Sequence, residues 1–138
     1  MILELARAKI NLTLDILKLR KDGFHEVEMI MQTLDLADEV ELTQIKSGIE
    51  LKVDATQIKG GENIPCDEKN LAYRAAVAVN GYCRKNFGVL INLVKKIPAA
   101  AGLGGGSADA AAVIRGMNWL FDLNLKTDDL CRIGAQVG

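Results

Sequence analysis

The chain of 138 residues is 49% hydrophobic and 25% charged, a length and composition that suit one globular domain with its own core. Its 17 basic and 18 acidic side chains give a formal net charge of −1, which argues against a protein that coats nucleic acid or an acidic membrane. No apolar stretch has the length of a membrane span and the first residues lack the pattern of a signal peptide, so we expect a cytoplasmic protein.

The N-terminal half is predicted to be mainly β. From Lys9 to Ile16, polar and apolar residues alternate, which is the period of a strand. A polar turn at 20–23 follows, and further strands are expected at 26–36, 38–44 and 49–53, with Leu36, Ala37 and Asp38 separating the first two. A loop rich in glycine and other helix breakers, residues 59–67, ends this half.

The C-terminal half is predicted to be mainly helical. Asn70 is a suitable N-cap for a helix that ends near Lys85. The elements expected after it are a strand at 89–94, a helix from about Ser107 to 121, and a helix capped by Thr127 that ends near 134. This order predicts an α+β fold, a two-layer sandwich in which helices pack on one face of a mixed β-sheet.

The segment PAAAGLGGGSADAAA, residues 98–112, has four glycines within five residues and leads from the predicted strand into the long helix. This arrangement often binds phosphate, because the first N–H groups of a helix are unpaired and the positive end of its dipole lies there. A Walker A loop is excluded because it requires a lysine before Ser107, and the dinucleotide fingerprint fails because its third glycine would fall at Ser107. A tight turn with a purely structural role is the alternative.

Two other groups of residues are candidates for catalysis or for substrate binding. Period two places Lys9, Asn11 and Thr13 in one row, where a lysine is suited to neutralise a transferring phosphoryl group; a solvated sheet face is the alternative. Phe24 lies beside His25, the only histidine. Together they offer a stacking plane and a hydrogen-bonding edge for a nucleotide base, and the alternative is an ordinary surface loop.

Three segments resemble the GHMP kinase superfamily: AKINL at 8–12, GFHE at 23–26 and PAAAGLGGGSA at 98–108. The first two narrow the resemblance to the branch that acts on a cytidine diphosphate derivative of methylerythritol in non-mevalonate isoprenoid biosynthesis. The resemblance implies an enzyme that uses ATP and Mg²⁺ and transfers the γ-phosphoryl group to a hydroxyl of that small molecule. It also implies that residues 1–138 are the N-terminal ATP-binding domain of such a kinase, without its C-terminal domain.

The same resemblance assigns roles to single residues. Lys9 is expected to be catalytic, and Ser107 to contact the metal ion. Asn11, Phe24 and His25 are expected to contact the cytidine substrate. The expected ATP-binding residues are Asn70, Lys95, Pro98, Ala99, Ala100, Ala101, Gly102, Leu103, Gly104, Gly105, Gly106, Ser107, Ala108 and Asp109.

The family's general base is expected to follow Gly138, so residues 1–138 alone are predicted to have little or no kinase activity.

Two alternative functions are considered. The first is a mevalonate- or homoserine-type kinase, and the segment GFH is evidence against it. The second is a non-catalytic nucleotide- or RNA-binding domain. The balanced charge and the aromatic content of 4% argue against the second. We expect no nucleic-acid or membrane partner, and the oligomeric state is left open. The cysteines, Cys66, Cys83 and Cys131, are expected to be reduced and mostly in the core.

Overall fold

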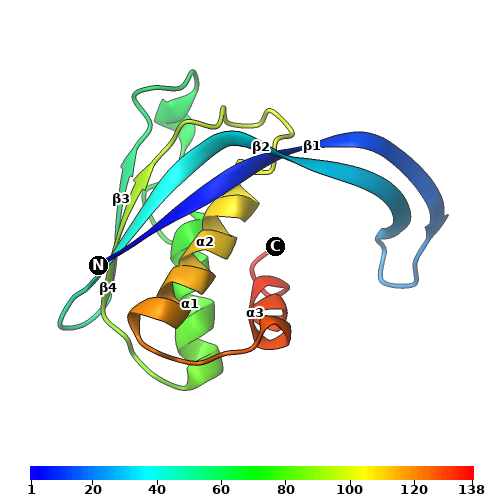
Figure 1. Cartoon of the computed structure of the whole chain (residues 1–138). Helices are drawn as coiled ribbons and strands as arrows, with labels where there is room; N and C mark the ends of the chain where they lie inside the picture. The colour runs from blue at the N-terminus through cyan, green and yellow to red at the C-terminus, as the bar shows by residue number, and fades with distance from the viewer.

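The structure is a computed structural model that describes the backbone of residues 1–138 and every side chain except that of Glu62. Along this backbone, four strands form one sheet in the order β1-β2-β4-β3, and helices cover one face of it (Figure 1). The elements are β1 (Ile2–Leu19), β2 (His25–Gln44), β3 (Ile49–Asp54), η1 (Gly61–Asn63), α1 (Leu71–Cys83), β4 (Val89–Val94), α2 (Gly105–Leu120) and α3 (Thr127–Gly134). β2 runs antiparallel to β1 and β4, while β3 and β4 are parallel. The predicted α+β two-layer fold is confirmed.

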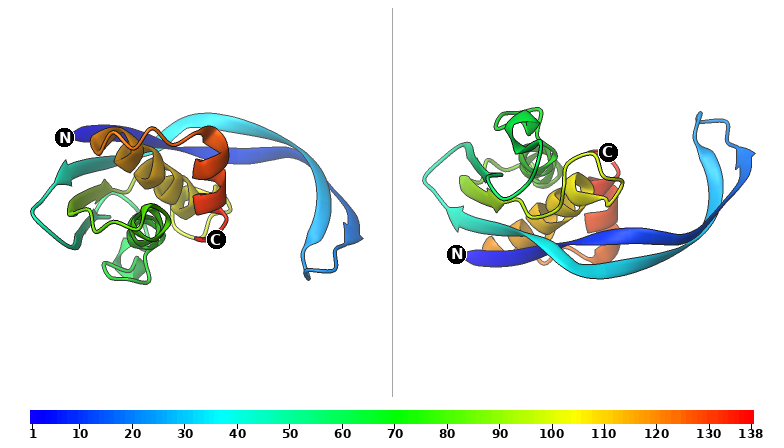
Figure 2. Two further views of the ribbon diagram at one scale, coloured as in Figure 1. Left: turned by 90° about the horizontal axis from the view of Figure 1, so that it is seen from below. Right: turned by 90° about the horizontal axis from the view of Figure 1, so that it is seen from above.

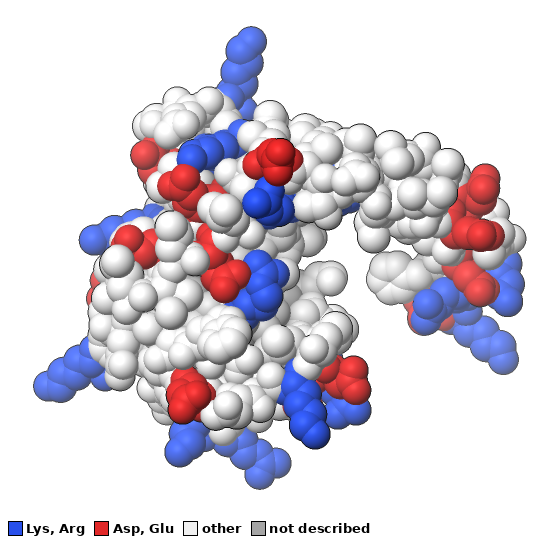
Figure 3. All heavy atoms as spheres, in the orientation of Figure 1, with Lys and Arg blue, Asp and Glu red and all other residues white. Residues whose placement is uncertain are grey.

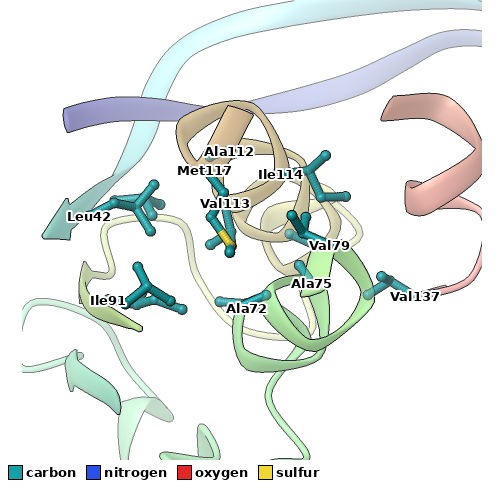
Figure 4. Packing of buried hydrophobic residues seen from close by; sticks show 14 of the residues in the cluster. Leu42, Ala72, Ala75, Val79, Ile91, Ala112, Val113, Ile114, Met117 and Val137 are labelled. Atoms are coloured by element: carbon teal, nitrogen blue, oxygen red, sulfur yellow. The ribbon is translucent and has the colours of Figure 1, made fainter. Parts of the chain in front are cut away.

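The core lies between the sheet and the pair α1 and α2. On β4, Val89, Ile91 and Leu93 are buried and alternate with half-buried residues, because successive side chains of a strand point to opposite faces. Small side chains on the inner helix faces let the backbones approach closely. They are Ala72, Ala75, Ala76, Ala110 and Ala112, all buried. Figure 4 shows how the side chains of both helices converge on Leu42 and Ile91 of the sheet.

The two strands predicted at 26–36 and 38–44 are one continuous strand, β2. Pairing with β1 runs through the expected break, since Arg7 pairs with Ala37 and Ala6 with Asp38. The register shifts just beyond this point, between Arg7 and Lys9, so of the residues that suggest a turn only Leu36 lies in an irregularity of the ladder. The prediction of a strand end there is wrong because the partner strand continues.

Three helix boundaries also differ from prediction. α1 ends at Cys83, since Arg84 adopts a left-handed φ of 52°. α2 begins at Gly105 with Gly104 as its N-cap, so Ser107 lies within the first turn and does not cap the helix. α3 begins at Thr127, and its N-cap is Lys126. The predicted cap of α1 is confirmed, because the side chain of Asn70 accepts a hydrogen bond from the N–H of Ala72 at 2.9 Å.

The cysteines carry free thiols, but their placement differs from prediction. Cys83 is half-buried, whereas Cys66 and Cys131 are exposed. Cys66 lies in the loop before α1, and Cys131 lies in the short helix α3. The expectation that the cysteines lie mostly in the core is therefore wrong.

Beyond the body of the domain, β1 and β2 continue as a curved two-stranded arm, residues 10–36 (Figures 1 and 2). Its middle carries large apolar side chains that face solvent, including Leu12, Leu14, Ile16, Ile30 and Met31, which are 51–66% exposed. Figure 3 shows a nearly uncharged middle section and a charged tip. Among the described residues, no helix combines the length and the apolar character required to cross a membrane.

Candidate functional site

The glycine loop, residues 98–104, joins β4 to α2 and lines a pocket of about 390 Å³. Residues 105–107 of α2, together with Asn70 and Lys95, form other parts of its wall. Ala108 donates to the carbonyl of Gly104 at 2.9 Å, so the amides of residues 105–107 precede the hydrogen-bond ladder of the helix. Such amides, at the positive end of a helix dipole, can bind an anionic group.

Two glycines are required by the shape of the loop. Gly104 has a φ of 73°, a left-handed conformation that a residue with a Cβ adopts at a cost. A Cβ on Gly105 would lie 3.1 Å from Cγ2 of Ile97 and 3.4 Å from Nζ of Lys95. The start of α2 therefore packs directly against the residues that follow β4, so the two ends of the loop lie close together.

Lys9 reaches this loop from β1. Its backbone N–H donates to the carbonyl of Leu103 at 3.0 Å, and its Nζ donates to the carbonyl of Gly102 at 3.0 Å. The structure thus brings the predicted catalytic lysine to the predicted phosphate loop. In this state the ammonium is bonded to a loop carbonyl, so it would have to exchange that bond to reach a phosphoryl group.

Lys95 lies buried in the pocket wall between two acids. Its Nζ donates to Oδ2 of Asp38 at 2.5 Å and to Oδ2 of Asp109 at 2.6 Å, and all three residues are at most 4% exposed. One ammonium therefore faces two carboxyl groups with little water. Burial raises the pKa of Asp109 to about 7, since the attraction of Lys95 only partly offsets it and the charge of Asp38 adds to it.

The side chains of Asn70 and Lys95, two predicted ATP-binding residues in the pocket wall, form their hydrogen bonds within the protein. Asn70 caps α1 and donates from Nδ2 to the carbonyl of Pro65 at 2.7 Å. Lys95 is held by the two acids. Among the described buried side-chain atoms, Oδ1 of Asp109 has no hydrogen-bond partner, and Asp109 lines the pocket. That oxygen is an acceptor for which the folded chain supplies no donor.

One oxygen group at the pocket suits a magnesium ion that arrives with phosphates. Ser107 is exposed and lines the pocket, whereas Oδ1 of Asp109 is buried. Among the described side chains, no three His, Cys, Asp or Glu gather as a metal site. Mg²⁺ usually binds one or two protein oxygens together with substrate phosphates and water, so the hydroxyl of Ser107 fits an ion shared with a nucleotide.

The predicted substrate residues lie at opposite ends of the arm, whose course is seen in Figure 1. Phe24 is 73% exposed in the turn at the tip, and His25 begins β2. Asn11 pairs with Met31 near the base of the arm, two residues from Lys9. The register shifts between Asn11 and Thr13, so the expected single row of Lys9, Asn11 and Thr13 is interrupted.

Asp38, which pairs with Lys95 of the pocket wall, is a residue that the sequence pattern did not single out. The pattern suggests a break between two strands at Leu36, Ala37 and Asp38, with the second strand beginning at Asp38. Asp38 lies in phase with Val40 and Leu42, and all three are fully buried on the helix-facing side of β2. A charged residue at an inward position of an alternating strand is the signal that could have identified it.

The arrangement defines the chain as an α+β domain whose glycine loop, at a helix N-terminus, is suited to an anionic ligand. Residues 70–138 match the family model described as the N-terminal domain of the GHMP kinases. The chain belongs to the GHMP kinase family.

Individual relatives agree with this assignment. A 4-diphosphocytidyl-2-C-methyl-D-erythritol kinase of Bacillus velezensis is 47% identical over 137 residues, which make up 99% of this chain and 46% of that protein. The crystal structure of a 4-(cytidine 5'-diphospho)-2C-methyl-D-erythritol kinase matches with a TM-score of 0.78 at 34% identity, covering 99% of this chain and 46% of the other. A homoserine kinase from Cytophaga hutchinsonii matches with a TM-score of 0.66 at 26% identity, covering 77% and 34%. The chain thus spans about half the length of the curated relative, 46%.

Proposed function

We propose that this chain is the ATP-binding domain of a 4-diphosphocytidyl-2-C-methyl-D-erythritol kinase. The enzyme transfers the γ-phosphoryl group of ATP to a hydroxyl of 4-diphosphocytidyl-2-C-methyl-D-erythritol. The observation that carries the proposal is the glycine loop that opens α2 onto a pocket while Lys9 contacts its backbone. The name and the 47% identity of the relative described above support the choice of substrate.

The chemistry of phosphoryl transfer suits these groups. Its transition state needs positioning and charge neutralisation rather than a covalent nucleophile. The loop from Pro98 to Ala108 surrounds the ATP phosphates, with the backbone N–H groups of residues 105–107 as donors, and Lys9 stabilises the charge on the transferred group. A bound magnesium ion would neutralise phosphate charge, with Ser107 as its protein contact. Asn70, Lys95 and Asp109 form the wall toward the adenosine end of ATP.

The arm supplies the second substrate's contacts in this proposal. Phe24 stacks on the cytosine ring, His25 hydrogen-bonds to its edge, and Asn11 lies along the path toward Lys9. The exposed position of Phe24 and His25 at the arm tip leaves their side chains accessible to a ligand. The enzyme is a cytoplasmic one that acts on a small molecule and needs no nucleic-acid or membrane partner.

A substrate screen tests the proposal. The full-length kinase that contains this domain is assayed for ATP consumption with the cytidyl substrate, homoserine and mevalonate. We expect turnover with the cytidyl substrate to exceed turnover with either other acceptor by at least about 100-fold, because unfilled base contacts at Phe24 and His25 forfeit binding energy. Preference for homoserine or mevalonate would contradict the substrate assignment while leaving the kinase class intact. No ATP consumption with any acceptor would contradict both.

A further inference from the structure

The carboxylate of Asp38 contacts the residues before the glycine loop directly and the helix after it through Lys95. Asp38 is 0% exposed and does not line the pocket wall as described above, so it has no direct access to a ligand there. A buried carboxylate is costly to desolvate unless it is well paired. Its hydrogen bonds therefore show which parts of the fold it holds in place.

One oxygen holds the entry to the loop. Oδ1 of Asp38 accepts from the backbone N–H of Lys96 at 2.5 Å and from that of Ile97 at 2.8 Å. These two residues lie between the end of β4 at Val94 and the start of the loop. The carboxylate thus fixes the direction in which the chain leaves the sheet.

The other oxygen holds the exit through Lys95. Oδ2 of Asp38 accepts from Nζ of Lys95, which also donates to Asp109 in the first turns of α2. The same ammonium would lie 3.4 Å from a Cβ on Gly105. The start of α2 is therefore held against the end of β4 by an ion-pair chain that originates on β2.

We propose that Asp38 is a positioning residue that presets the glycine loop for its anionic ligand. With both ends fixed, the loop amides lie in one arrangement before the ligand arrives, so binding orders less of the chain and is stronger. The identity of the ligand as ATP rests on the proposed function. The claim about the loop itself rests only on the contacts of Asp38.

The variant Asp38→Asn keeps the contacts to the backbone N–H groups before the loop and removes the contact to Lys95. An asparagine can still accept from the N–H groups of Lys96 and Ile97, but its amide N–H₂ then faces the ammonium of Lys95, and two donors cannot pair. We expect ATP affinity, measured by titration calorimetry, to fall by about tenfold or more. Glu41→Gln is the matched control, because Glu41 also links β2 to β4, through Asn92 at 2.9 Å, without contacting the loop. We expect its ATP affinity to match that of the unmodified protein.

Amide hydrogen exchange gives a second measurement that a purely structural role would not reproduce. The N–H groups of Lys9 and Ala108 donate to loop residues, whereas those of Ile45 and Val89 close the opposite end of the sheet. In Asp38→Asn we expect the first pair to exchange at least about tenfold faster and the second pair to keep its rate. Equal acceleration of all four would mean general destabilisation and overturn the proposal.

The outcomes distinguish a failure of this inference from a failure of the proposed function. If the unmodified protein binds no ATP, the proposed function fails, and the exchange rates of Lys9 and Ala108 alone decide whether Asp38 positions the loop. If ATP binds and Asp38→Asn changes neither affinity nor those rates, the positioning role is wrong and the proposed function stands. Circular dichroism and a cooperative unfolding transition confirm that each variant is folded.

Discussion

At Asp109, the desolvation of a buried carboxylate competes with the attraction of Lys95. Desolvation is the larger of the two effects, and the ammonium of Lys95 also pairs with Asp38. Burial raises the pKa of Asp109 to about 7, so near neutral pH this side chain holds its proton for part of the time. In the proposed function, an uncharged Asp109 would repel the phosphates of ATP less than a carboxylate would.

The raised pKa makes folding depend on pH in a defined direction. Between about pH 4 and about pH 7, folded Asp109 binds a proton that the unfolded chain releases, so its contribution to stability is complete at low pH and is lost as pH rises through 7. In Asp109→Asn this contribution is absent. We expect the free energy of unfolding of the variant, relative to the unmodified protein, to rise by more than about 1 kcal/mol from about pH 4.5 to about pH 7.5. Parallel pH profiles in denaturant titrations would contradict the assignment.

Lys9 is the residue whose removal should act on catalysis. In the full-length kinase, we expect Lys9→Met to lower kcat/KM by at least about 100-fold, or about 3 kcal/mol in transition-state stabilisation. Lys18→Met is the control, because Lys18 is an exposed lysine of the same strand that pairs with Glu26 at 2.9 Å. Steady-state kinetics with both variants make the comparison. Unchanged turnover in Lys9→Met would remove this lysine from the mechanism.

At the scale of elements, α2 serves both the core and the pocket. Its N-terminal end follows the glycine loop and lines the pocket, and its middle packs on β1 and β2. Gly116 lies at that contact, and a Cβ there would overlap Cδ1 of the buried Leu42. The close approach of helix and sheet, rather than backbone conformation, therefore requires this glycine.

Two glycine-to-alanine changes distinguish packing from helix propensity. Gly116→Ala should destabilise the fold by about 1–3 kcal/mol, because Leu42 must move within a filled core. Gly81→Ala in α1 should stabilise it by about 0.5–1 kcal/mol, since a Cβ there meets no atom of the described residues within 4 Å. Denaturant titration of both variants provides the measurement. Destabilisation by both would mean that the contact with Leu42 does not decide the sign.

At the scale of the whole molecule, the body and the arm differ in how they are held. The body has a two-layer core, whereas the arm consists of two paired strands whose side chains are almost all exposed. A two-stranded ribbon has little stability of its own and is held by the body from which it extends. Its middle exposes several large apolar side chains, among them Leu14, Ile16 and Ile30, and groups of exposed apolar side chains often mark interaction surfaces.

The arm should govern association rather than stability. We expect Leu14→Lys combined with Ile16→Lys to reduce concentration-dependent self-association in sedimentation velocity, because the exposed apolar surface of the strands becomes charged. The free energy of unfolding should change by less than about 0.5 kcal/mol. Val77→Lys, which alters an apolar residue of α1 that is 49% exposed, should leave association unchanged. A large loss of stability in the double variant would show that the arm packs on the body.

Local chemistry in the sequence was enough to predict several parts of the protein. Asn70 as a cap, alternation along β4, and glycines ahead of α2 depend on neighbours within a few residues, so their pattern is visible in one dimension. The same patterns predicted the two-layer fold and located the glycine loop that lines the pocket. Boundaries at Ser107 and at Asp38 were misplaced, because a glycine N-cap and a continuing partner strand overrode the local signals.

Tertiary structure alone decided the long-range contacts of the site. Lys9 reaches Gly102 across 93 residues, and Asp38 reaches Lys95 across 57. These pairs meet because β2 lies between β1 and β4 in the sheet. The order of strands in a sheet produces no periodic pattern of residues in the sequence. The sequence by itself determined which residues could bind phosphate, and the packing of strands determined which charges hold them in place.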